Sequence, residues 1–308
     1  MKIFTIIVTY NAMRNEWIYK CLDSLLSSDL NTEIIVIDNA STDETCQVIK
    51  DRYPTIILIE NSENQGFGAA NNQGFEKALE LGCEYLFLLN QDAWVEKGCI
   101  EKLVNCCIEN PDFGIISPIH LNGKGDALDY NFSLCLAPEF CKGFYSDAVL
   151  GKFKKNLYSL PFVNAAAWLL SKETLKNVGG FNPSFYHYAE DDNFCQRTLY
   201  HNFKIGILNE TFIYHDREER SSVVDISKIK ERRLILHYSN PQKEINLRKE
   251  LKRIKVSFLK NKIMGRHQNV LDDKAKRNYL NLNFENILKN LEISKSQQEF
   301  KFLKKSNE

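Results

Sequence analysis

The sequence lacks several features that mark whole classes of protein. No apolar run approaches the ~20 residues that a membrane-spanning helix needs, and the longest stretch, Leu160–Leu170, contains Pro161 and Asn164. No CxxC pair occurs, and the nine cysteines are odd in number, with Cys106 and Cys107 adjacent. These absences argue against an integral membrane protein and against a disulfide framework, and they predict a cytosolic chain with reduced thiols.

Net charge is also absent, because the 308 residues hold 40 basic and 40 acidic side chains. With 44% hydrophobic residues, the composition is that of a folded globular protein. Neutrality gives no reason to expect nucleic-acid binding. The charge is nevertheless divided unevenly, since residues 1–227 hold 19 basic and 31 acidic side chains while residues 228–308 hold 21 and 9.

Glycine almost disappears after residue 226, where only Gly265 remains. The apolar residues there recur at helical spacing, as in Leu251, Ile254, Phe258 and Leu259. We therefore expect one domain over residues 1–226 and a basic helical C-terminal extension over residues 227–308. The extension has two interpretations, a solvated helical surface or a surface that binds anionic membranes.

The first 120 residues alternate hydrophobic strand patterns with helical patterns. This rhythm predicts an α/β fold with a mainly parallel central sheet, flanked by helices and joined by right-handed crossovers. Residues 1–120 are expected to form the first half of this domain, and residues 121–226 the second half. The expected strands are Ile3–Thr9, Glu33–Asp38, Thr55–Glu60, Glu84–Leu89, Leu134–Leu136, Phe162–Leu170, Ile205–Leu208 and Phe212–His215, with a helix from Glu190 to His201.

Polar residues follow each of the first four expected strands. Strand one ends in Thr9-Tyr10-Asn11, strand two runs into Asp38-Asn39, strand three precedes the glycine- and asparagine-rich residues 61–74, and strand four ends in Asn90-Gln91-Asp92. Ligands of open α/β sheets bind beyond the carboxyl ends of the strands. The sequence therefore predicts one polar site at this edge.

Neither common phosphate-binding loop is present. The chain has no GxxxxGK[ST] motif and no GxGxxG motif, and Gly66-Phe67-Gly68 is only a partial match. A diphosphate would then need another counter-charge. A divalent metal held by a strand-end carboxylate such as Asp92 would supply it, and an oxygen-rich site suits Mg or Mn.

Six segments, in this order and spacing, resemble family 2 inverting glycosyltransferases of the GT-A fold, and most closely the rhamnosyltransferase-like group. They are Thr9-Tyr10-Asn11, the run from Asp38 to Asp43, the run from Asn64 to Gly74, Leu89-Asn90-Gln91-Asp92, Gly179-Gly180-Phe181, and the run from Glu190 to Arg197. The resemblance covers about residues 3–220, and it implies that residues 1–226 are a catalytic domain with a nucleotide-binding half over residues 1–120 and an acceptor half over residues 121–226. It implies a nucleotide-diphosphate sugar donor, such as a dTDP- or UDP-sugar, and a saccharide or lipid-linked acceptor.

The resemblance also implies roles for individual residues. Thr9 and Asp38 would lie against the ribose and base, and the Gly66–Asn72 segment near the nucleotide and sugar. The family's Asp-x-Asp metal motif here reads Asn90-Gln91-Asp92, and His215 follows a late strand, where relatives often place a third ligand. A histidine hydrogen-bonded to backbone is an equal alternative for His215. The candidate donor-binding residues are Thr9, Asn11, Asp38, Asn39, Gly66, Asn71, Asn72 and Asp92, and the candidate ligands of Mn or Mg are Asp92, Asn90 and His215.

By the same resemblance, Asp191 is the catalytic base. Glu190, Asp191 and Asp192 cannot all point one way, because successive helical residues are about 100° apart. The alternative for these acids is a charged helix start that complements the helix dipole. Candidate acceptor contacts are Trp168, His187 and Glu190, although Trp168 equally fits the core, and Arg197 could pair with an acid or a phosphate.

The predicted function is the transfer of a sugar to an acceptor with inversion at the anomeric carbon, and rhamnose is one candidate sugar. We expect this reaction to serve bacterial surface polysaccharide synthesis at the inner face of the plasma membrane. Because Asn90 replaces an acid, a catalytically weak sugar-nucleotide binder or scaffold protein is the alternative. A nucleotidyltransferase is disfavoured, since the first strand is not followed by a glycine-rich loop with Arg or Lys.

Overall fold

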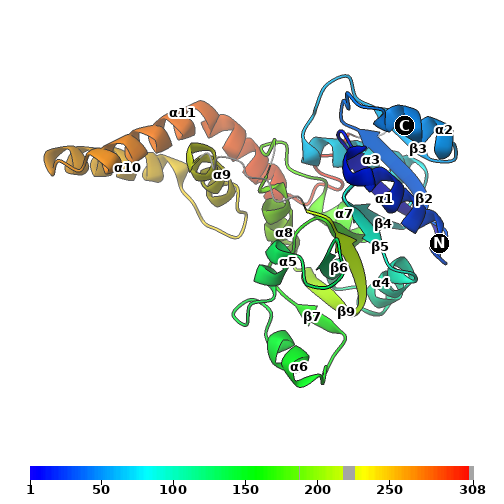
Figure 1. The fold of residues 1–308 in the computed structure, drawn as a ribbon. Coiled ribbons are helices and arrows are strands. Elements are labelled where there is room, and N and C mark those ends of the chain that lie inside the picture. The colour runs from blue at the N-terminus through cyan, green and yellow to red at the C-terminus, as the bar shows by residue number, and fades with distance from the viewer. Residues whose placement is uncertain (187, 218–225, 305–308) are drawn as a thin grey trace.

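The computed structural model describes residues 1–186, 188–217 and 226–304, with the side chains of residues 226–228 left aside. Its described residues form one nine-stranded mixed sheet with helices on both faces, from which a helical arm projects (Figure 1). The strands are β1 (Ile3–Thr9), β2 (Glu33–Asp38), β3 (Ile57–Glu60), β4 (Tyr85–Leu89), β5 (Ala93–Val95), β6 (Phe113–Asn122), β7 (Leu157–Ser159), β8 (Ala167–Ser171) and β9 (Lys204–His215).

The helices follow the strands in an alternating order through the first half of the chain. They are α1 (Trp17–Leu26), α2 (Thr45–Arg52), α3 (Phe67–Glu80), α4 (Cys99–Glu109), α5 (Tyr130–Cys135), α6 (Phe144–Leu150), α7 (Lys172–Val178), α8 (Glu190–Tyr200), α9 (Ile226–Tyr238), α10 (Leu247–Ile263) and α11 (His267–Lys295), with a short 3-10 turn at Arg14–Glu16. The α/β prediction is therefore confirmed.

The sheet order is β3-β2-β1-β4-β8-β6-β9-β5, with β7 added beside β9. The strands β3, β2, β1 and β4 run parallel, as their almost wholly hydrophobic sequences predict. β8 then pairs antiparallel with both β4 and β6. All four polar strand ends of the nucleotide-binding half consequently lie at one edge of the sheet.

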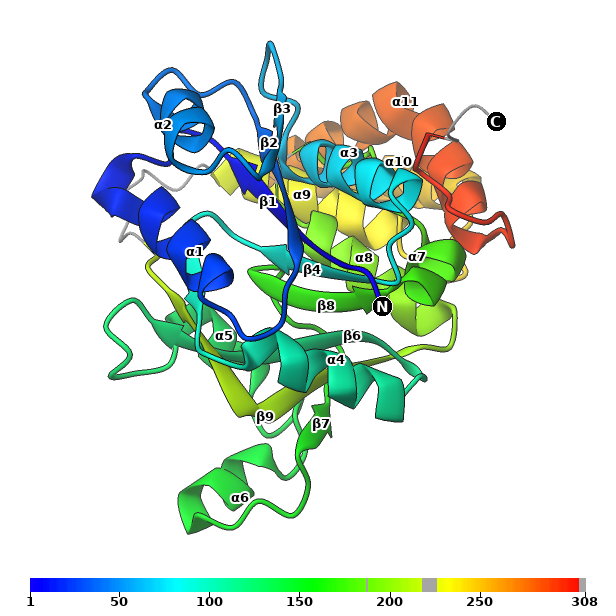
Figure 2. The same ribbon diagram turned by 90° about the vertical axis from the view of Figure 1, so that its right-hand side faces the viewer.

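Two hydrophobic layers cover the sheet. On one face α3 packs closely, because a Cβ at Gly74 would overlap the side chains of Ile6 and Ile37. On the other face α1 and α4 cover the strands, burying residues such as Leu22 and Leu103 (Figure 2). Burying both faces rigidifies the strands whose ends carry the polar residues.

Several element predictions for the second half were wrong. Leu134–Leu136 is not a strand but the end of α5 and its cap, and Asp129 caps this helix by accepting the Phe132 N–H at 2.8 Å. Ile205–Leu208 and Phe212–His215 are one strand, β9, with a register shift against β6. The strand predicted from Phe162 begins only at Ala167.

The C-terminal region is helical, as predicted. α10 and α11 form an antiparallel pair that extends away from the sheet (Figure 1), and they share a small core with α9 that includes Tyr238, Ile254 and Leu280. None of the helices within the described ranges is long and apolar enough to span a bilayer.

After α11 the chain returns to the catalytic domain. The Gly180 N–H donates to the Lys301 carbonyl at 2.9 Å, and the Lys304 N–H donates to Glu76 at 2.7 Å. The Lys301 side chain is fully buried and its ammonium donates to the Asn177 carbonyl. The final described residues are thus part of the catalytic domain's packing, although they lie beyond the arm in sequence.

Candidate functional site

The ends of β1 and β2 are joined through a buried carboxylate. Thr9 Oγ1 donates to Asp38 Oδ1 at 2.8 Å, and the Ser41 N–H donates to Asp38 Oδ2 at 2.8 Å. Asn11 continues this network, because its side-chain oxygen accepts the Thr42 N–H at 2.8 Å. Thr9 and Asp38 are buried, whereas Asn11 is partly exposed. The structure therefore brings Thr9, Asn11 and Asp38 together as one hydrogen-bonded group.

Asn39 organises the loop after β3. Its amide group donates to Asn64 Oδ1 at 2.9 Å, and its side-chain oxygen accepts the Gln65 N–H at 2.9 Å and the Asn61 amide at 3.2 Å. Asn39 is buried. Its hydrogen bonds hold the 61–66 loop against the end of β2, so Asn39 supports the site by shaping this loop.

The glycines that open α3 let it approach the segment before α8. Gly66 has φ of +82°, and a Cβ there would collide with the Tyr186 carbonyl oxygen. A Cβ at Gly68 would lie 3.0 Å from the Cβ of Phe181 and 3.7 Å from that of Glu190. Only small residues allow this contact, which places the predicted donor loop directly against the predicted catalytic acids.

Asn71 and Asn72 both lie on α3 but differ in their partners. Asn71 donates to the Phe67 carbonyl of its own helix at 2.9 Å. Asn72 accepts the Phe181 N–H at 2.7 Å and donates to the Phe181 carbonyl at 2.9 Å, with a longer bond to the Phe302 carbonyl at 3.4 Å. Asn72 therefore joins α3 to the Gly179–Phe181 turn and to the C-terminal segment.

Asp92 and His215 lie next to each other, with Asp92 between β4 and β5 and His215 at the end of β9. His215 Nε2 lies 3.3 Å from Asp92 Oδ1, and His215 Nδ1 lies 3.4 Å from Asp129 Oδ2. Arg217 Nε lies 3.2 Å from the same Asp129 oxygen. Burial alone would lower the pKa of His215, but the two carboxylates outweigh it and raise the pKa to about 9. Sequence reasoning missed Asp129, because only the fold brings α5 beside β9.

These residues fit a divalent metal in part. A carboxylate that holds one imidazole nitrogen leaves the other nitrogen directed at a metal, which is the usual outer-shell arrangement. Asp129 would orient His215 in this way, while Asp92, 18% exposed, stays accessible. No cluster of three or more His, Cys, Asp or Glu with metal-binding geometry occurs among the described residues. The protein would therefore offer two donors, Asp92 and His215, with Asn90 adjacent, leaving other positions to the ligand and water.

The three acids at the start of α8 have different environments. Glu190 is buried, its Oε2 has no hydrogen-bond partner within the described part of the chain, and burial with the Asp191 charge raises its pKa to about 8. Asp191 accepts the Asp192 N–H at 2.9 Å, and burial raises its pKa. Burial and the Asp191 charge raise the pKa of Asp192 to about 7.

A strained turn directs these acids. Tyr188 and Ala189 both have positive φ, +70° and +69°, which is costly for residues with a side chain. The backbone of Ala165 interacts with the Asp191 carboxylate, and the neighbouring Ala166 carbonyl accepts the Asn90 N–H at 2.9 Å. Asp191 and the start of the Asn90-Gln91-Asp92 motif thus approach adjacent residues of one segment.

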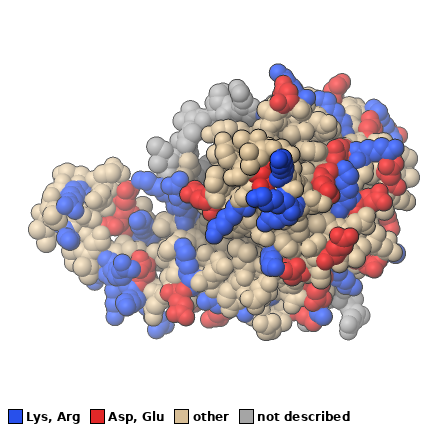
Figure 3. Space-filling view, turned by 90° about the horizontal axis from the view of Figure 1, so that it is seen from below, with Lys and Arg blue, Asp and Glu red and all other residues tan. Residues whose placement is uncertain are grey.

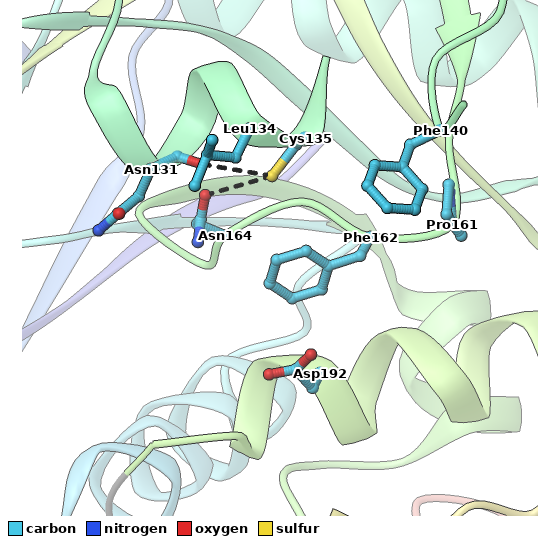
Figure 4. A pocket seen from close by; sticks show the side chains of 8 residues that line it. All are labelled: Asn131, Leu134, Cys135, Phe140, Pro161, Phe162, Asn164 and Asp192. Carbon is cyan, nitrogen blue, oxygen red and sulfur yellow. Dashed lines mark hydrogen bonds between the residues drawn. The ribbon is translucent and has the colours of Figure 1, made fainter. Parts of the chain in front are cut away.

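A cavity of about 360 Å³ opens beside these acids, and Asp192 points toward it (Figure 4). It combines aromatic rings with amide side chains, and no sequence motif indicated it. Its lining residues are Asn131, Leu134, Cys135, Phe140, Pro161, Phe162, Asn164 and Asp192.

The remaining site predictions have separate outcomes. Trp168 is wrong as an acceptor contact, because it has no exposed surface and packs in the core beside Phe181 and Phe194. Within the described part of the chain Arg197 pairs with no acid, since it is fully buried and its guanidinium donates to the Gly180 carbonyl and to Asn193. His187 lies outside the described residues.

Known proteins resemble this chain in sequence and in fold. The model of the family "Glycosyl transferase family 2" matches residues 5–178. A low-salt glycan biosynthesis hexosyltransferase of Haloferax volcanii is 30% identical over 178 residues, covering 56% of this chain and 55% of that protein. An N-acetylglucosaminyl-diphospho-decaprenol L-rhamnosyltransferase of Mycobacterium tuberculosis is 23% identical over 189 residues, covering 54% and 60%. The chain thus spans little more than half the length of these relatives.

Two solved structures share the fold at low identity. S. aureus TarS in complex with UDP-GlcNAc has a TM-score of 0.57 at 17% identity, covering 80% of this chain and 68% of that one. A mannosyltransferase of Pyrobaculum calidifontis in complex with GDP-Man and Mn2+ has a TM-score of 0.56 at 18% identity, covering 80% and 65%. With the family model matching more than half of its residues, the chain belongs to glycosyl transferase family 2 and has the GT-A fold.

Proposed function

We propose that the chain transfers a sugar from a nucleotide-diphosphate donor to a hydroxyl of a saccharide acceptor with inversion at the anomeric carbon. The observation that carries this proposal is that the Asp191 carboxylate lies near the backbone of Ala165, next to Ala166, whose carbonyl accepts the Asn90 N–H at 2.9 Å. A candidate base and the expected diphosphate position would thereby lie near each other. Two such groups beside one segment suit a displacement that needs a base on one side and a stabilised leaving group on the other.

The donor would lie along the ends of β1, β2 and β4. The network of Thr9, Asn11 and Asp38 offers hydroxyl, amide and carboxylate groups for a ribose and a base. The bound Mn2+ of the Pyrobaculum mannosyltransferase structure and of the GalNAc-T7 structure with UDP supports a metal at the diphosphate. Asp92 and His215 would hold it, and when bound it would neutralise the departing diphosphate.

Asp191 would act as the general base. As the acceptor oxygen forms its bond to the anomeric carbon, the hydroxyl proton passes to an Asp191 oxygen. The bond from the anomeric carbon to the diphosphate oxygen breaks, and the electron pair leaves with the diphosphate. The raised pKa of Asp191 favours proton capture, because a stronger base takes a proton more readily.

The cavity of Figure 4 would receive the acceptor sugar. Phe140 and Phe162 offer apolar faces to a sugar ring, and Asn131, Asn164 and Asp192 offer polar groups to its hydroxyls. The relatives act on glycans and on a diphospho-decaprenol lipid. We accordingly infer a hexose donor, with rhamnose one candidate, and a lipid-linked or glycan acceptor in surface polysaccharide synthesis.

One observation favours a second candidate, a sugar-nucleotide binder with little turnover. Position 90 holds Asn, and the described residues present only two close metal donors, Asp92 and His215. Transfer or donor hydrolysis that depends on Mn would exclude this candidate, whereas clean nucleotide binding without turnover would support it.

The catalytic assignment is tested by Asp191→Asn, with Asp192→Asn as the matched control on the same helix. We expect Asp191→Asn to lower kcat by roughly 10²- to 10⁴-fold, because the amide cannot accept the proton. Asp192→Asn should lower kcat by less than about tenfold, since the Asp192 side chain lines the proposed acceptor cavity and is not the proposed base. Near wild-type turnover by a folded Asp191→Asn variant would assign the base elsewhere.

A further inference from the structure

The helical arm carries a second apolar surface that faces away from its own core. The arm consists of α10 and α11, and its tip is residues 252–277 around the turn between them. Val256, Leu259 and Ile263 are exposed at 65%, 51% and 87%, and Met264 and Leu271 beside the turn are exposed at 51% and 59%. Soluble surfaces do carry single exposed apolar residues, but five on one tip form a patch.

The patch lies on one face of α10. At about 100° per residue, Val256, Leu259 and Ile263 fall within about 60° of one another, whereas Ile254 lies about 160° from Val256. Ile254 belongs to the core shared with α9 and α11. α10 thus has two apolar faces, and among the residues that the structure describes only the face with Ile254 is covered by other parts of the chain.

The same tip is strongly basic. It contains nine Lys and Arg residues but only two acids, Asp272 and Asp273. Both acids are engaged: Asp272 pairs with Lys230 at 2.9 Å, and buried Asp273 accepts from Ser257 and Asn261 at 2.8 Å each. Of the nine basic residues, only Arg253 forms an ion pair within the described ranges, with Glu250. Figure 3 shows blue side chains gathered along the arm, with tan atoms at its far end.

We propose that the arm tip is a docking surface for an anionic lipid bilayer. Lys255, Lys260 and Lys262 flank the apolar row, and lysine stems can lie on apolar surface while their ammonium groups reach lipid phosphates. The bilayer thus accepts the apolar row and the lysines together. A protein interface fits less well, because interface centres are depleted of Lys, and two copies of this tip would bring like charges together.

The arm is fixed to the catalytic domain near the acids of α8. The Asn290 amide of α11 donates to Ser184 at 2.6 Å. The Arg232 guanidinium of α9, a helix that shares the core of the arm, lies 4.1 Å from the centre of the Tyr188 ring. A tip bound to a bilayer would therefore hold the acceptor side of the site at about the length of the arm from the lipid surface, roughly 35 Å along α11 from His267 to Asn290 at 1.5 Å per residue. That consequence rests on the proposed function, whereas the docking does not.

Co-flotation with vesicles tests the docking without any sugar donor, so its outcome is independent of catalysis. We expect the wild-type chain to bind phosphatidylcholine vesicles with 30% phosphatidylglycerol at least about tenfold more tightly than vesicles of phosphatidylcholine alone. The preference should shrink as salt rises from about 0.1 M to about 0.5 M, because screening weakens attraction to the charged surface.

Two double variants separate the apolar and basic contributions. Leu259→Ser/Ile263→Ser and Lys255→Glu/Lys262→Glu should each weaken binding by roughly tenfold or more. The matched controls are Ile108→Ser, an exposed apolar residue on α4, and Lys172→Glu, an exposed residue at the first position of α7; both should bind as wild type.

Three results would overturn the proposal. The wild-type chain could fail to bind either vesicle, or the tip variants could bind as well as the controls. Light scattering could instead show a dimer that Leu259→Ser/Ile263→Ser dissociates, which would assign the apolar row to a second copy. Circular dichroism of each variant confirms that the arm has kept its helices.

Discussion

At the scale of single residues, the start of α8 places three neighbouring acids in different surroundings. Glu190 is 6% exposed and has one oxygen without a partner in the described structure, while Asp191 is held by backbone and Asp192 borders the acceptor cavity. A buried carboxyl without a partner favours its neutral form. Glu190 therefore serves this site as a protonated neighbour of the proposed base, which limits the negative charge around Asp191.

Glu190→Gln should make stability less dependent on pH. The pKa of Glu190 is about 8 when folded and near 4.5 ordinarily, so the folded state keeps a proton that the unfolded state releases between these values. Wild-type stability should fall as pH rises from about 5 to about 9. The free energy of unfolding, measured with urea, should fall between these two pH values by about 1–3 kcal/mol less in the variant than in the wild type.

The exposed Glu101→Gln on α4 is the control for this pH series and should leave the wild-type slope unchanged. Asp191 and Asp192 also have raised pKa values, so the variant should keep a smaller slope of the same sign. Equal slopes in Glu190→Gln and wild type would mean that Glu190 is ionised throughout.

Motifs predicted which residues gather at the site but not what each one contacts. The positions of Thr9 and Asp38 at strand ends and of Asp191 at a helix start could be predicted because these are local features, whereas their roles came from the family resemblance. Trp168 and Arg197 could not be assigned, since their burial depends on Phe181, Phe194 and the Gly180 carbonyl, which belong to other elements. Asp129 was missed for the same reason.

At the scale of elements, α3 contacts both the loop after β3, which belongs to the proposed donor site, and the start of α8, which carries the proposed base. Its first turn contacts Tyr186 and Glu190 through the space left by Gly66 and Gly68. Its middle binds the Phe181 backbone through Asn72. A shift of α3 would therefore disturb the donor loop and the position of α8 together.

Asn72→Ala should destabilise the fold by about 2–4 kcal/mol, because the buried N–H and C=O of Phe181 would lose their partners. Asn71→Ala is the matched control on the same helix and should cost less than about 1 kcal/mol, since Asn71 bonds only within α3 among the described residues. Denaturant unfolding of both variants measures the difference. Similar values for the two would show that the Phe181 bonds contribute little.

Element prediction succeeded where hydrophobic pattern and period agreed. The four parallel strands were found because each is a short apolar run between helical patterns. β6 was missed, since Gly114 and Pro118 interrupt its sequence although it lies in the middle of the sheet. The end of α5 resembled a strand because Leu134, Cys135 and Leu136 are adjacent apolar residues, whereas the helix depends on the Asp129 cap.

At the scale of the whole molecule, the net charge is zero, but the excess of acidic and the excess of basic side chains lie in different parts of the structure. The acidic part of the sequence forms the sheet domain, and the basic part forms α9 to α11 and the return segment. The arm points away from the sheet rather than folding over it (Figure 1). Most of its positive charge is consequently available to a partner outside the catalytic domain.

Donor binding should be visible as a rise in the melting temperature of the whole chain, because a ligand that binds only the folded state stabilises it. At about 100 times its Kd, the right nucleotide sugar adds about 2.7 kcal/mol, and a panel with and without Mn would rank dTDP-, UDP- and GDP-sugars. Asp92→Asn should lose the part of the shift that depends on Mn. If no nucleotide sugar raises the melting temperature, the donor assignment fails.

The bond from Asn72 to the Phe302 carbonyl joins residues 230 positions apart. A ribosome adds about 5–20 residues per second, so roughly 10–50 s of translation separate these two partners. Asn72 and the Gly180 backbone therefore emerge from the ribosome before Lys301 and Phe302, whose carbonyl groups accept their hydrogen bonds. The nascent sheet domain therefore lacks these two contacts until the ribosome has synthesised α10, α11 and the segment that follows them.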